Sequence, residues 1–251
     1  MMEKISHKEM LEAGVHFGHL KRKWNPKMLP YIFAERKGIH LIDLNKTSET
    51  LEEAAHAVRQ IVKSGRKVLF VATKKQAKEV VKAEAKRANM PFVTERWLGG
   101  MLTNFATIRR SVKKMESIRK LLDDKSTTSL TKKERLLLSR QLQKLDMVLG
   151  GIEHLNRVPA AVYVVDITYE DIAIKEAKKL GIRTLGMVDT NSNPNSIDFP
   201  IPSNDDAANS IHLITRCLAE AAIAGAQDRA QMKEENAKSE EKESTEEKAS
   251  E

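Results

Sequence analysis

The sequence predicts an α/β fold in which parallel strands form a sheet with helices on each side, and two observations support this prediction. Short apolar runs rich in branched residues alternate along the chain with longer amphipathic stretches. Runs such as VLFV and VYVV do not alternate with polar residues, which is typical of parallel strands that are covered on both faces. The length of 251 residues fits one large domain or two modest ones.

Five strands are expected, and helices join most of them. Parallel strands need crossovers of about a dozen residues or more, and the stretches between most of the runs are long enough. The expected strands are 39–44, 67–73, 91–96, 160–166 and 183–189. The expected helices are 46–64, 74–89 and 169–180. Gly65 and Gly181 directly follow two of these helices, at the position where a left-handed closing residue is favoured.

The connection 101–155 is too long for a simple crossover and shows no strand pattern. Its apolar residues follow alternating spacings of three and four, as in coiled-coil helices. They are Met101, Phe105, Ile108, Val112, Met115, Ile118 and Leu122, then Leu138, Leu142, Leu145, Leu149 and Ile152. A polar turn at 123–130 separates the two stretches, and Thr131 with Glu134 predicts a capping box that opens the second helix. We therefore expect an antiparallel coiled-coil hairpin that protrudes from the sheet domain, with a dimerising coiled coil as the alternative.

The formal net charge of +8 is unevenly distributed. Residues 63–144 hold 22 basic and 7 acidic residues, a balance of +15. The parts 1–62, 145–227 and 228–251 carry +2, −5 and −4. A concentrated basic block attracts polyanions through Coulomb forces and through release of their condensed counterions. Nucleic acid is therefore the expected ligand, and a solvated basic helical face is the alternative.

Cysteine content and hydropathy exclude several classes of protein. The single cysteine, Cys217, can form neither an internal disulfide nor a multi-thiolate metal site, and its place in an apolar helical pattern predicts a small core residue. No run approaches the roughly 20 apolar residues that a membrane span requires, and the first ten residues lack the apolar stretch of a signal peptide. We expect a cytoplasmic protein that contacts no membrane.

These patterns divide the chain into three parts. Residues 1–100 and 156–226 are expected to form the α/β sheet domain, and 101–155 the inserted hairpin. Residues 227–251 are rich in Glu, Lys and Ser and poor in apolar side chains, so we expect a disordered charged tail.

The N-terminal segment 14–36 is expected to be a loop that contacts nucleic acid. Trp24, Tyr31 and Phe33 lie among cations, so their rings could stack on exposed bases while the cations hold phosphates. Equally, Trp24 could be an apolar plug that fixes the loop on the sheet domain. Arg96 and Trp97, just before the hairpin, could face nucleic acid or wedge the hairpin against the sheet. The residues expected to contact nucleic acid are Arg22, Lys23, Trp24, Asn25, Lys27, Arg96, Arg109, Arg110, Lys113, Lys114, Lys132 and Lys133.

Two groups of polar residues are candidates for metal binding or catalysis. His16 and His19 could share a metal with a carboxylate from elsewhere, but two ligands are a weak signal and structural histidines are favoured. Asp43, Asp166 and Asp189 each end an expected strand and could hold magnesium for phosphoryl transfer at the carboxyl edge of the sheet. No glycine-rich phosphate loop follows any strand, so a magnesium-dependent phosphoryl-transfer enzyme is only the alternative interpretation.

Seven sequence blocks carry a family resemblance. They are GVHFGHLKRKWNPKMLPYIF, GIHLIDLNKT, RWLGGMLTNFATI, AVYVVD, IKEAKKLGI, MVDTNSNPNSIDFPIP and NDDA. In this order, from about Met10 to Gly225, they resemble the family of the second protein of the bacterial small ribosomal subunit. The resemblance implies a flavodoxin-like or Rossmann-like sheet with a protruding coiled-coil hairpin, and a structural protein that is not an enzyme.

The resemblance also implies partners and ligands. The partners are 16S ribosomal RNA, at the junction of head and body on the back of the subunit, and neighbouring small-subunit proteins. Among these is the large multi-OB-fold protein that captures mRNA, which this family helps to recruit. Neither a small-molecule substrate nor a required cofactor is implied. A zinc or magnesium ion is associated with some members, and its ligands here would be His16, Asp189 and Asp205.

Overall fold

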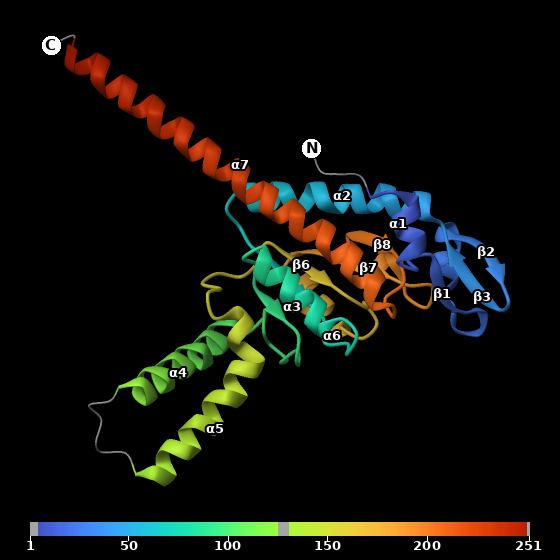
Figure 1. Cartoon of the computed structure of the whole chain (residues 1–251), viewed down its shortest axis with the longest axis horizontal. Helices are drawn as coiled ribbons and strands as arrows, with labels where there is room; N and C mark the ends of the chain where they lie inside the picture. The colour runs from blue at the N-terminus through green and yellow to red at the C-terminus, as the bar shows by residue number, and fades with distance from the viewer. Residues whose placement is uncertain (1–4, 125–130, 250–251) are drawn as a thin grey trace.

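The computed structural model describes residues 5–124 and 131–249, and its centre is a five-stranded parallel sheet (Figure 1). The strand order is β5-β4-β6-β7-β8, with every neighbouring pair parallel. The strands are β4 Val68–Val71, β5 Phe92–Val93, β6 Ala161–Val164, β7 Arg183–Val188 and β8 Phe199–Pro202. The α/β class and four of the five expected strands, 67–73, 91–96, 160–166 and 183–189, are thereby confirmed.

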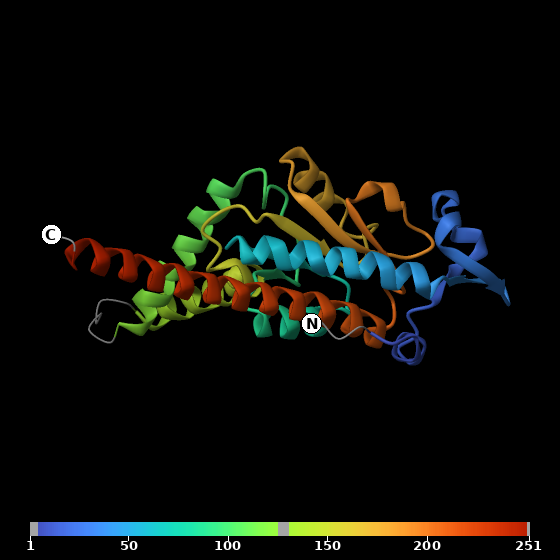
Figure 2. The same ribbon diagram turned by 90° about the horizontal axis from the view of Figure 1, so that it is seen from above.

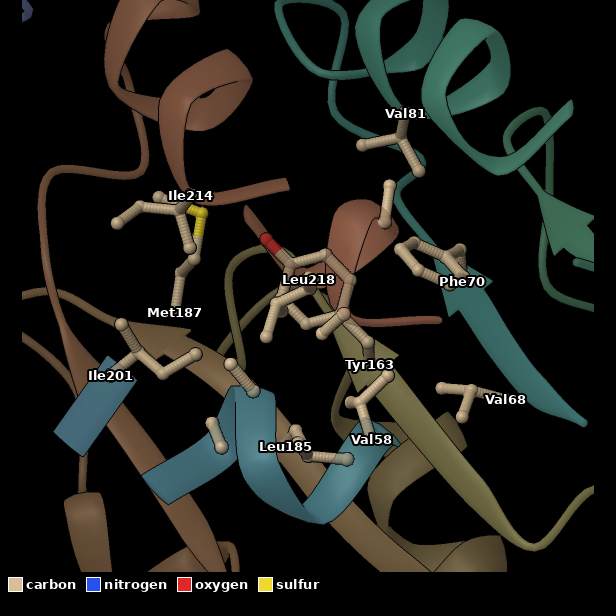
Figure 3. Packing of buried hydrophobic residues seen from close by; sticks show 14 of the residues in the cluster. Val58, Val68, Phe70, Val81, Tyr163, Leu185, Met187, Ile201, Ile214 and Leu218 are labelled. Atoms are coloured by element: carbon tan, nitrogen blue, oxygen red, sulfur yellow. The ribbon is translucent and has the colours of Figure 1, made fainter. Parts of the chain in front are cut away.

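Helices cover both faces of this sheet, which explains why its strands carry no polar alternation. Successive strand residues point to opposite faces, so Phe70 and Tyr163 join one apolar cluster while Val71 and Val164 join another. On the first face, Phe70 and Tyr163 meet side chains of α2, α3 and α7 (Figure 3). These helices are α2 Leu44–Lys63, α3 Lys78–Arg87 and α7 Ala208–Ala249. The other face is covered by α6 Asp171–Lys179 and by the root of a helical hairpin.

A separate three-stranded antiparallel sheet forms the N-terminal part of the chain, beside the short helix α1 His7–Glu12. Its strands are β1 Phe17–Leu20, β2 Ile32–Arg36 and β3 Ile39–Ile42, in the order β1-β3-β2. Two short 3-10 helices, η1 Lys21–Lys23 and η2 Pro26–Tyr31, connect β1 to β2. The segment 14–36 is therefore more ordered than the expected loop.

The expected place of 39–44 in the parallel sheet is wrong, because β3 pairs only with β1 and β2. A two-residue turn, Lys37 and Gly38, with φ values of 53° and 76°, joins β2 to β3 and fixes them as a hairpin. The fifth parallel strand is β8 instead. Its prolines, Pro200 and Pro202, are tolerated because β8 is an edge strand.

Helices α4 Phe105–Asp123 and α5 Lys132–Leu149 project away from the sheet, and η3 Gly150–Ile152 ends the second arm (Figures 1 and 2). The capping box of Thr131 and Glu134 at the start of α5 is confirmed. Ile108, Val112 and Met115 of α4 are buried, whereas Leu149 is the one buried residue within α5. Coiled-coil packing of the pair stays a prediction, and the turn at 125–130 lies outside the described residues.

Helix α7 continues to Ala249, so the expected disorder of 227–251 is not confirmed. Alanine, glutamate and lysine favour helices, a preference that an argument from low apolar content leaves out. Asp228 accepts two hydrogen bonds from Arg59 on α2, at 2.7 and 2.9 Å, so α7 contacts the sheet domain beyond residue 227. Residues 250 and 251 lie outside the described part. In the parts described, no helix is long and apolar enough to cross a membrane.

Candidate nucleic-acid interface

Two basic regions lie at opposite ends of the molecule's longest axis. The N-terminal sheet with η1 and η2 forms one end, and the hairpin of α4 and α5 projects toward the other (Figures 1 and 2). We name the first the N-terminal basic region; it contains Arg22, Lys23 and Lys27, all exposed. A ligand that touches both regions must extend along the molecule.

The first arm of the hairpin has an exposed α4 basic face, made of Arg110, Lys113, Lys114 and Lys120. Spacings of three, one and six residues place these side chains on the side of α4 opposite its buried residues Ile108, Val112, Met115 and Ile118. None of the four cations forms an ion pair with a residue that the structure describes. Their charges are therefore free to meet phosphates.

The second arm has an α5 basic row of Lys133, Arg140 and Lys144, on the side of α5 turned away from α4. Spacings of seven and four residues keep the three on one side of the helix. Lys132 is exposed as well, at the first residue of α5. Since the two helices pack against each other, the α4 basic face and the α5 basic row point to different sides of the hairpin.

Two arginines of α4 are used inside the fold. Arg109, an expected nucleic-acid contact, donates to the backbone oxygen of Glu153 at 2.8 Å and to Oδ1 of Asn156 at 3.0 Å. Arg119 donates to Asp146 on the second arm and to Glu153 at the root of that arm. Both guanidinium groups hold α4 to the chain that returns to the sheet. The structure therefore gives Arg109 an internal role, and Arg110 beside it is the exposed cation.

Glu176 of α6 holds the segment that leads into the hairpin. Its carboxylate accepts hydrogen bonds from Nε1 of Trp97, from the backbone N–H groups of Gly100, Leu102 and Thr103, and from Oγ1 of Thr103, at 2.7 to 3.2 Å. Burial opposes the charged form, but these donors outweigh it and lower the pKa of Glu176. We call this arrangement the Glu176 cluster.

The Glu176 cluster decides between the two interpretations of the residues before the hairpin. Trp97 is buried and wedges this segment against α6, while Arg96 beside it is exposed. Arg96 therefore remains available to a ligand.

Asn25 and Gly18 hold the N-terminal part against the end of the parallel sheet, whereas Trp24 packs on a residue of the N-terminal sheet itself. The Trp24 ring is half-buried with its centroid 5.4 Å from that of His40. The backbone N–H of Asn25 donates to the oxygen of Thr190, which follows β7, at 2.8 Å. Gly18 of β1 also lies so close to Thr190 that a Cβ there would come within 2.6 Å of the threonine side chain. Trp24 thus contributes to packing and keeps one part of its ring accessible.

A cluster of charged side chains lies at the carboxyl ends of the parallel strands, next to β1. Lys74, after β4, contacts Asp166 at 3.2 Å, Asp205 at 2.8 Å and Asp206 at 2.6 Å. Burial opposes the charge of Lys74, but the hydrogen bonds and charges of the three aspartates outweigh this and raise its pKa. The lysine supplies the positive charge at this edge, and we call the arrangement the Lys74 cluster.

The donor set for a metal ion differs from the expected His16, Asp189 and Asp205. His19, Asp205 and Asp206 each offer a ligand atom, and these atoms lie within 4.8 Å of one another. His16 is not part of this group. Asp189 contacts Nδ1 of His19 at 2.9 Å, which leaves Nε2 to face Asp206 at 3.5 Å. Asp189 is therefore placed to orient the histidine rather than to bind the ion.

The electrostatics of this set are compatible with a cation. Oδ2 of Asp205 is buried and has no hydrogen-bond partner among the described residues. Burial, followed by the charges of Asp166 and Asp189, raises the pKa of Asp205 to about 7. One imidazole and two carboxylates suit zinc, which binds three protein ligands and water at open sites.

The three aspartates of the enzyme alternative do not form one site. Asp43 caps the N-terminus of α2 by accepting from the N–H of Asn45 at 3.0 Å, and its strand belongs to the other sheet. Asp166 accepts from the N–H groups of Thr168 and Tyr169, and Asp189 is buried against Thr190. Among the described residues, the carboxylates of Asp43, Asp166 and Asp189 do not come together in a group that could hold a metal, so the shared magnesium site is not supported.

An exposed apolar patch lies on the N-terminal part of the chain. Leu11, Phe17 and Phe33 are 52%, 48% and 75% exposed, far more than a folded monomer requires of such large side chains. Leu11 and Phe33 line a hollow of about 270 Å³ whose other walls include Leu41 and Leu44. The sequence predicted only Phe33 among these three as a ring that could contact a ligand, and the fold places Leu11 and Phe17 on the surface as well.

A family model described as ribosomal protein S2 matches residues 10–225, which is most of the chain. The chain belongs to the ribosomal protein S2 family. This membership makes it a structural protein of the cytoplasmic small ribosomal subunit and not an enzyme, so the phosphoryl-transfer alternative is not supported.

Individual relatives are similar over most of their length. The chain is 65% identical to small ribosomal subunit protein uS2 of Cytophaga hutchinsonii, over 87% of this chain and 86% of that protein. Identity to the protein of the same name is 57% for Flavobacterium johnsoniae, over 93% of this chain and 92% of that protein. For Bacteroides thetaiotaomicron it is 56%, over 91% and 82%.

Proposed function

We propose that this ribosomal protein S2 family member binds 16S rRNA through two separated basic regions and so fixes the relative position of two RNA elements. The observation that carries the proposal is the α4 basic face, where four exposed cations have no acidic partner among the described residues. Phosphates are the ligands that such a face attracts, since their neutralisation releases condensed counterions. Sequence-specific base contacts are not required, because the folded shape of the RNA selects the site.

The N-terminal basic region supplies the second contact. Arg22, Lys23 and Lys27 are exposed at the opposite end of the molecule from the hairpin, and the accessible part of Trp24 lies among them. Asn25 and Arg96 are further candidates, the latter where the hairpin begins. We keep the three-part division, with 1–100 and 156–226 as sheet domain, 101–155 as hairpin and 227–251 as a charged extension, as part of the proposal.

A protein partner accounts for the apolar patch of Leu11, Phe17 and Phe33. Exposed aromatic side chains beside a hollow are typical of protein contact sites, and the patch lies next to the N-terminal basic region. We assign this patch to a neighbouring small-subunit protein. The multi-OB-fold protein that captures mRNA is the partner that the family resemblance implies.

A divalent metal ion would join β1 to the end of the parallel sheet. His19, Asp205 and Asp206 would hold it, and it would replace the attraction of the Lys74 ammonium for the two carboxylates. The ion would supply structural stability only. Metal analysis of the purified protein tests this, and protein that keeps neither zinc nor magnesium would remove the metal from the proposal.

Binding to small ribosomal subunits stripped of this protein tests the RNA contact. The variant Lys113→Ala/Lys114→Ala removes two cations of the α4 basic face without touching the buried side of α4. Each lost phosphate contact should lower the slope of log affinity against log salt by about 0.7 to 0.9. The matched control is Lys178→Ala/Lys179→Ala, which removes two exposed cations from α6.

The comparison of these two variants decides the proposal. Wild type and the α6 control should bind with the same affinity and salt slope, and the α4 variant should bind more weakly with a flatter slope. An α4 variant that behaves like the control would exclude this face as an RNA contact. A wild-type chain that does not bind subunits at low salt would refute the function as a whole.

A further inference from the structure

A cleft of about 490 Å³ lies between α3, the edge strand β5 and the root of the hairpin. We call it the β5 cleft. Its lining includes the apolar side chains of Met90, Phe92 and Leu155, which we call its floor, and lysines from α3. Its volume falls in the range of sites that hold small organic ligands. The α4 basic face and the N-terminal basic region lie outside this cleft.

The charge around the β5 cleft is positive once ion pairs are taken into account. Two acidic residues line it, but Glu95 contacts Lys78 at 2.8 Å and Asp146 contacts Arg119 at 2.9 Å. Neither of these cations lines the cleft, so the two acidic charges are compensated from outside it. What remains is a set of lysines that face the cleft without an acidic partner.

Three lysines make up this set. Lys82 and Lys86 of α3 form no ion pair with any residue in the described ranges. Lys67 donates to the backbone oxygen of Asn89 at 2.6 Å, a neutral acceptor that leaves the ammonium charge uncompensated. The β5 cleft therefore attracts anions.

The α5 basic row leads into this cleft. Lys133, Arg140, Lys144 and Met147 follow each other at spacings of seven, four and three residues, so they lie along one side of α5. Met147 is 65% exposed and lines the cleft. A polyanion that follows this row from the tip of the hairpin toward the sheet arrives at the lysines of α3.

The floor of the cleft can accept a base. The ring of Phe92 is partly exposed, and Nζ of Lys86 lies 6.0 Å from its centroid, so an aromatic face and a cation occur together. Unstacked bases of single-stranded RNA bind such surfaces by stacking while cations hold the adjacent phosphates. Gly151 allows the hairpin root to lie directly against β5, because a Cβ at this position would come within 2.2 Å of the backbone oxygen of Phe92.

We propose that the β5 cleft binds one unstacked nucleotide of a single-stranded rRNA segment whose phosphates continue along the α5 basic row. This rests on the proposed function, because it names an additional contact with the same RNA. Compensated acidic groups, uncompensated lysines and an apolar aromatic floor favour RNA over a protein segment as the occupant.

The test uses the full chain and stripped small subunits, with the variant Lys82→Ala/Lys86→Ala. Each contact to a single strand contributes about 0.7 to the slope of log affinity against log salt. Such a contact therefore strengthens binding about fivefold when the salt concentration falls from about 1 M to about 0.1 M. The double variant should therefore bind about 25-fold more weakly at 0.1 M salt, with a slope flatter by about 1.4. Neither lysine forms an ion pair among the described residues, so the melting temperature should not change. Lys178→Ala/Lys179→Ala is the matched control.

Ultraviolet cross-linking of the wild-type complex gives an independent readout. The expected product joins an rRNA nucleotide to the peptide that contains Phe92 or His154, the latter also lining the cleft. The proposal is overturned if the cleft variant binds like the control, or if these peptides cross-link to a protein instead of RNA. Loss of binding in the α4 variant alone would leave the proposed function intact and refute only the cleft.

Discussion

Replacing Glu176 with glutamine tests how the hairpin is held to the sheet. The amide oxygen can keep the three donors on the Oε2 side, namely the N–H groups of Leu102 and Thr103 and the Thr103 hydroxyl. The NH₂ group then faces the N–H of Gly100 and Nε1 of Trp97, which lose their acceptor. Two orphaned donors at about 1.5 kcal/mol each predict that the free energy of unfolding falls by about 3 kcal/mol.

The pH dependence gives this variant a second signature. The folded-state pKa of Glu176 lies below its usual value of 4.5, so the carboxylate stabilises the fold fully above pH 4.5. That stabilisation is lost as the pH falls through the lowered folded-state pKa. Glu176→Gln has no such group, so the difference in unfolding free energy between wild type and variant should be largest at neutral pH and shrink in acid.

Chemical denaturation at pH 7 and at acidic pH measures both effects. Hydrogen exchange at Gly100, Leu102 and Thr103 should accelerate in the variant, because these amides lose a charged acceptor. The control is Glu79→Gln, at an exposed glutamate of α3 with no ion pair among the described residues. If Glu176→Gln unfolds like this control, with unchanged amide exchange, the Glu176 cluster does not hold the hairpin.

Three further predictions concern the packing that supports the interface. Gly225→Ala places a Cβ 2.5 Å from the backbone oxygen of Arg59, so it should separate α7 from α2 and lower the unfolding free energy by about 2 kcal/mol in denaturant titrations; an unchanged midpoint would contradict this packing. Tyr163→Phe removes the buried bond to the Thr215 hydroxyl at 3.2 Å and should lower the same quantity by about 1 kcal/mol. Thr131→Ala removes the cap of α5, and native-state exchange should show the helix less protected by about 1 kcal/mol.

Local signals of the sequence predicted the parallel sheet well. The unbroken apolar runs of β4 and β6 follow directly from burial on both faces, and Gly65 and Gly181 have the positive φ values, 82° and 64°, that their position after helices predicted. The sheet to which strand 39–42 belongs was predicted wrongly, because an apolar run indicates that a strand is buried but not with which strand it pairs. Its partner was fixed by the tight turn at Lys37 and Gly38, which joins it to the preceding strand.

The sequence predicted the type of site, a basic surface for nucleic acid, better than it predicted the roles of single residues. Composition placed the cations on the hairpin, but adjacent arginines differ in role because Arg109 lies beside the buried seam and Arg110 lies opposite it. In the sequence His16 and His19 are equally good candidates for a metal ligand. The fold favours His19, because Asp206, far away in the sequence, lies beside its ring. Such choices depend on contacts between residues far apart in sequence, which periodicity does not encode.

The two basic regions act together only if the fold holds them at a fixed separation. The Glu176 cluster joins the hairpin to α6, and the contacts of His19 with Asp189 and Asp206 join β1 to the same sheet. When the first region is bound, a rigid connection presents the second at high effective concentration, whereas a loose one dilutes it over many orientations. Loosening either joint should therefore weaken binding to the subunit although every RNA-facing cation remains. Loss of affinity without a change in salt slope is the signature that separates this geometric role from the loss of a phosphate contact.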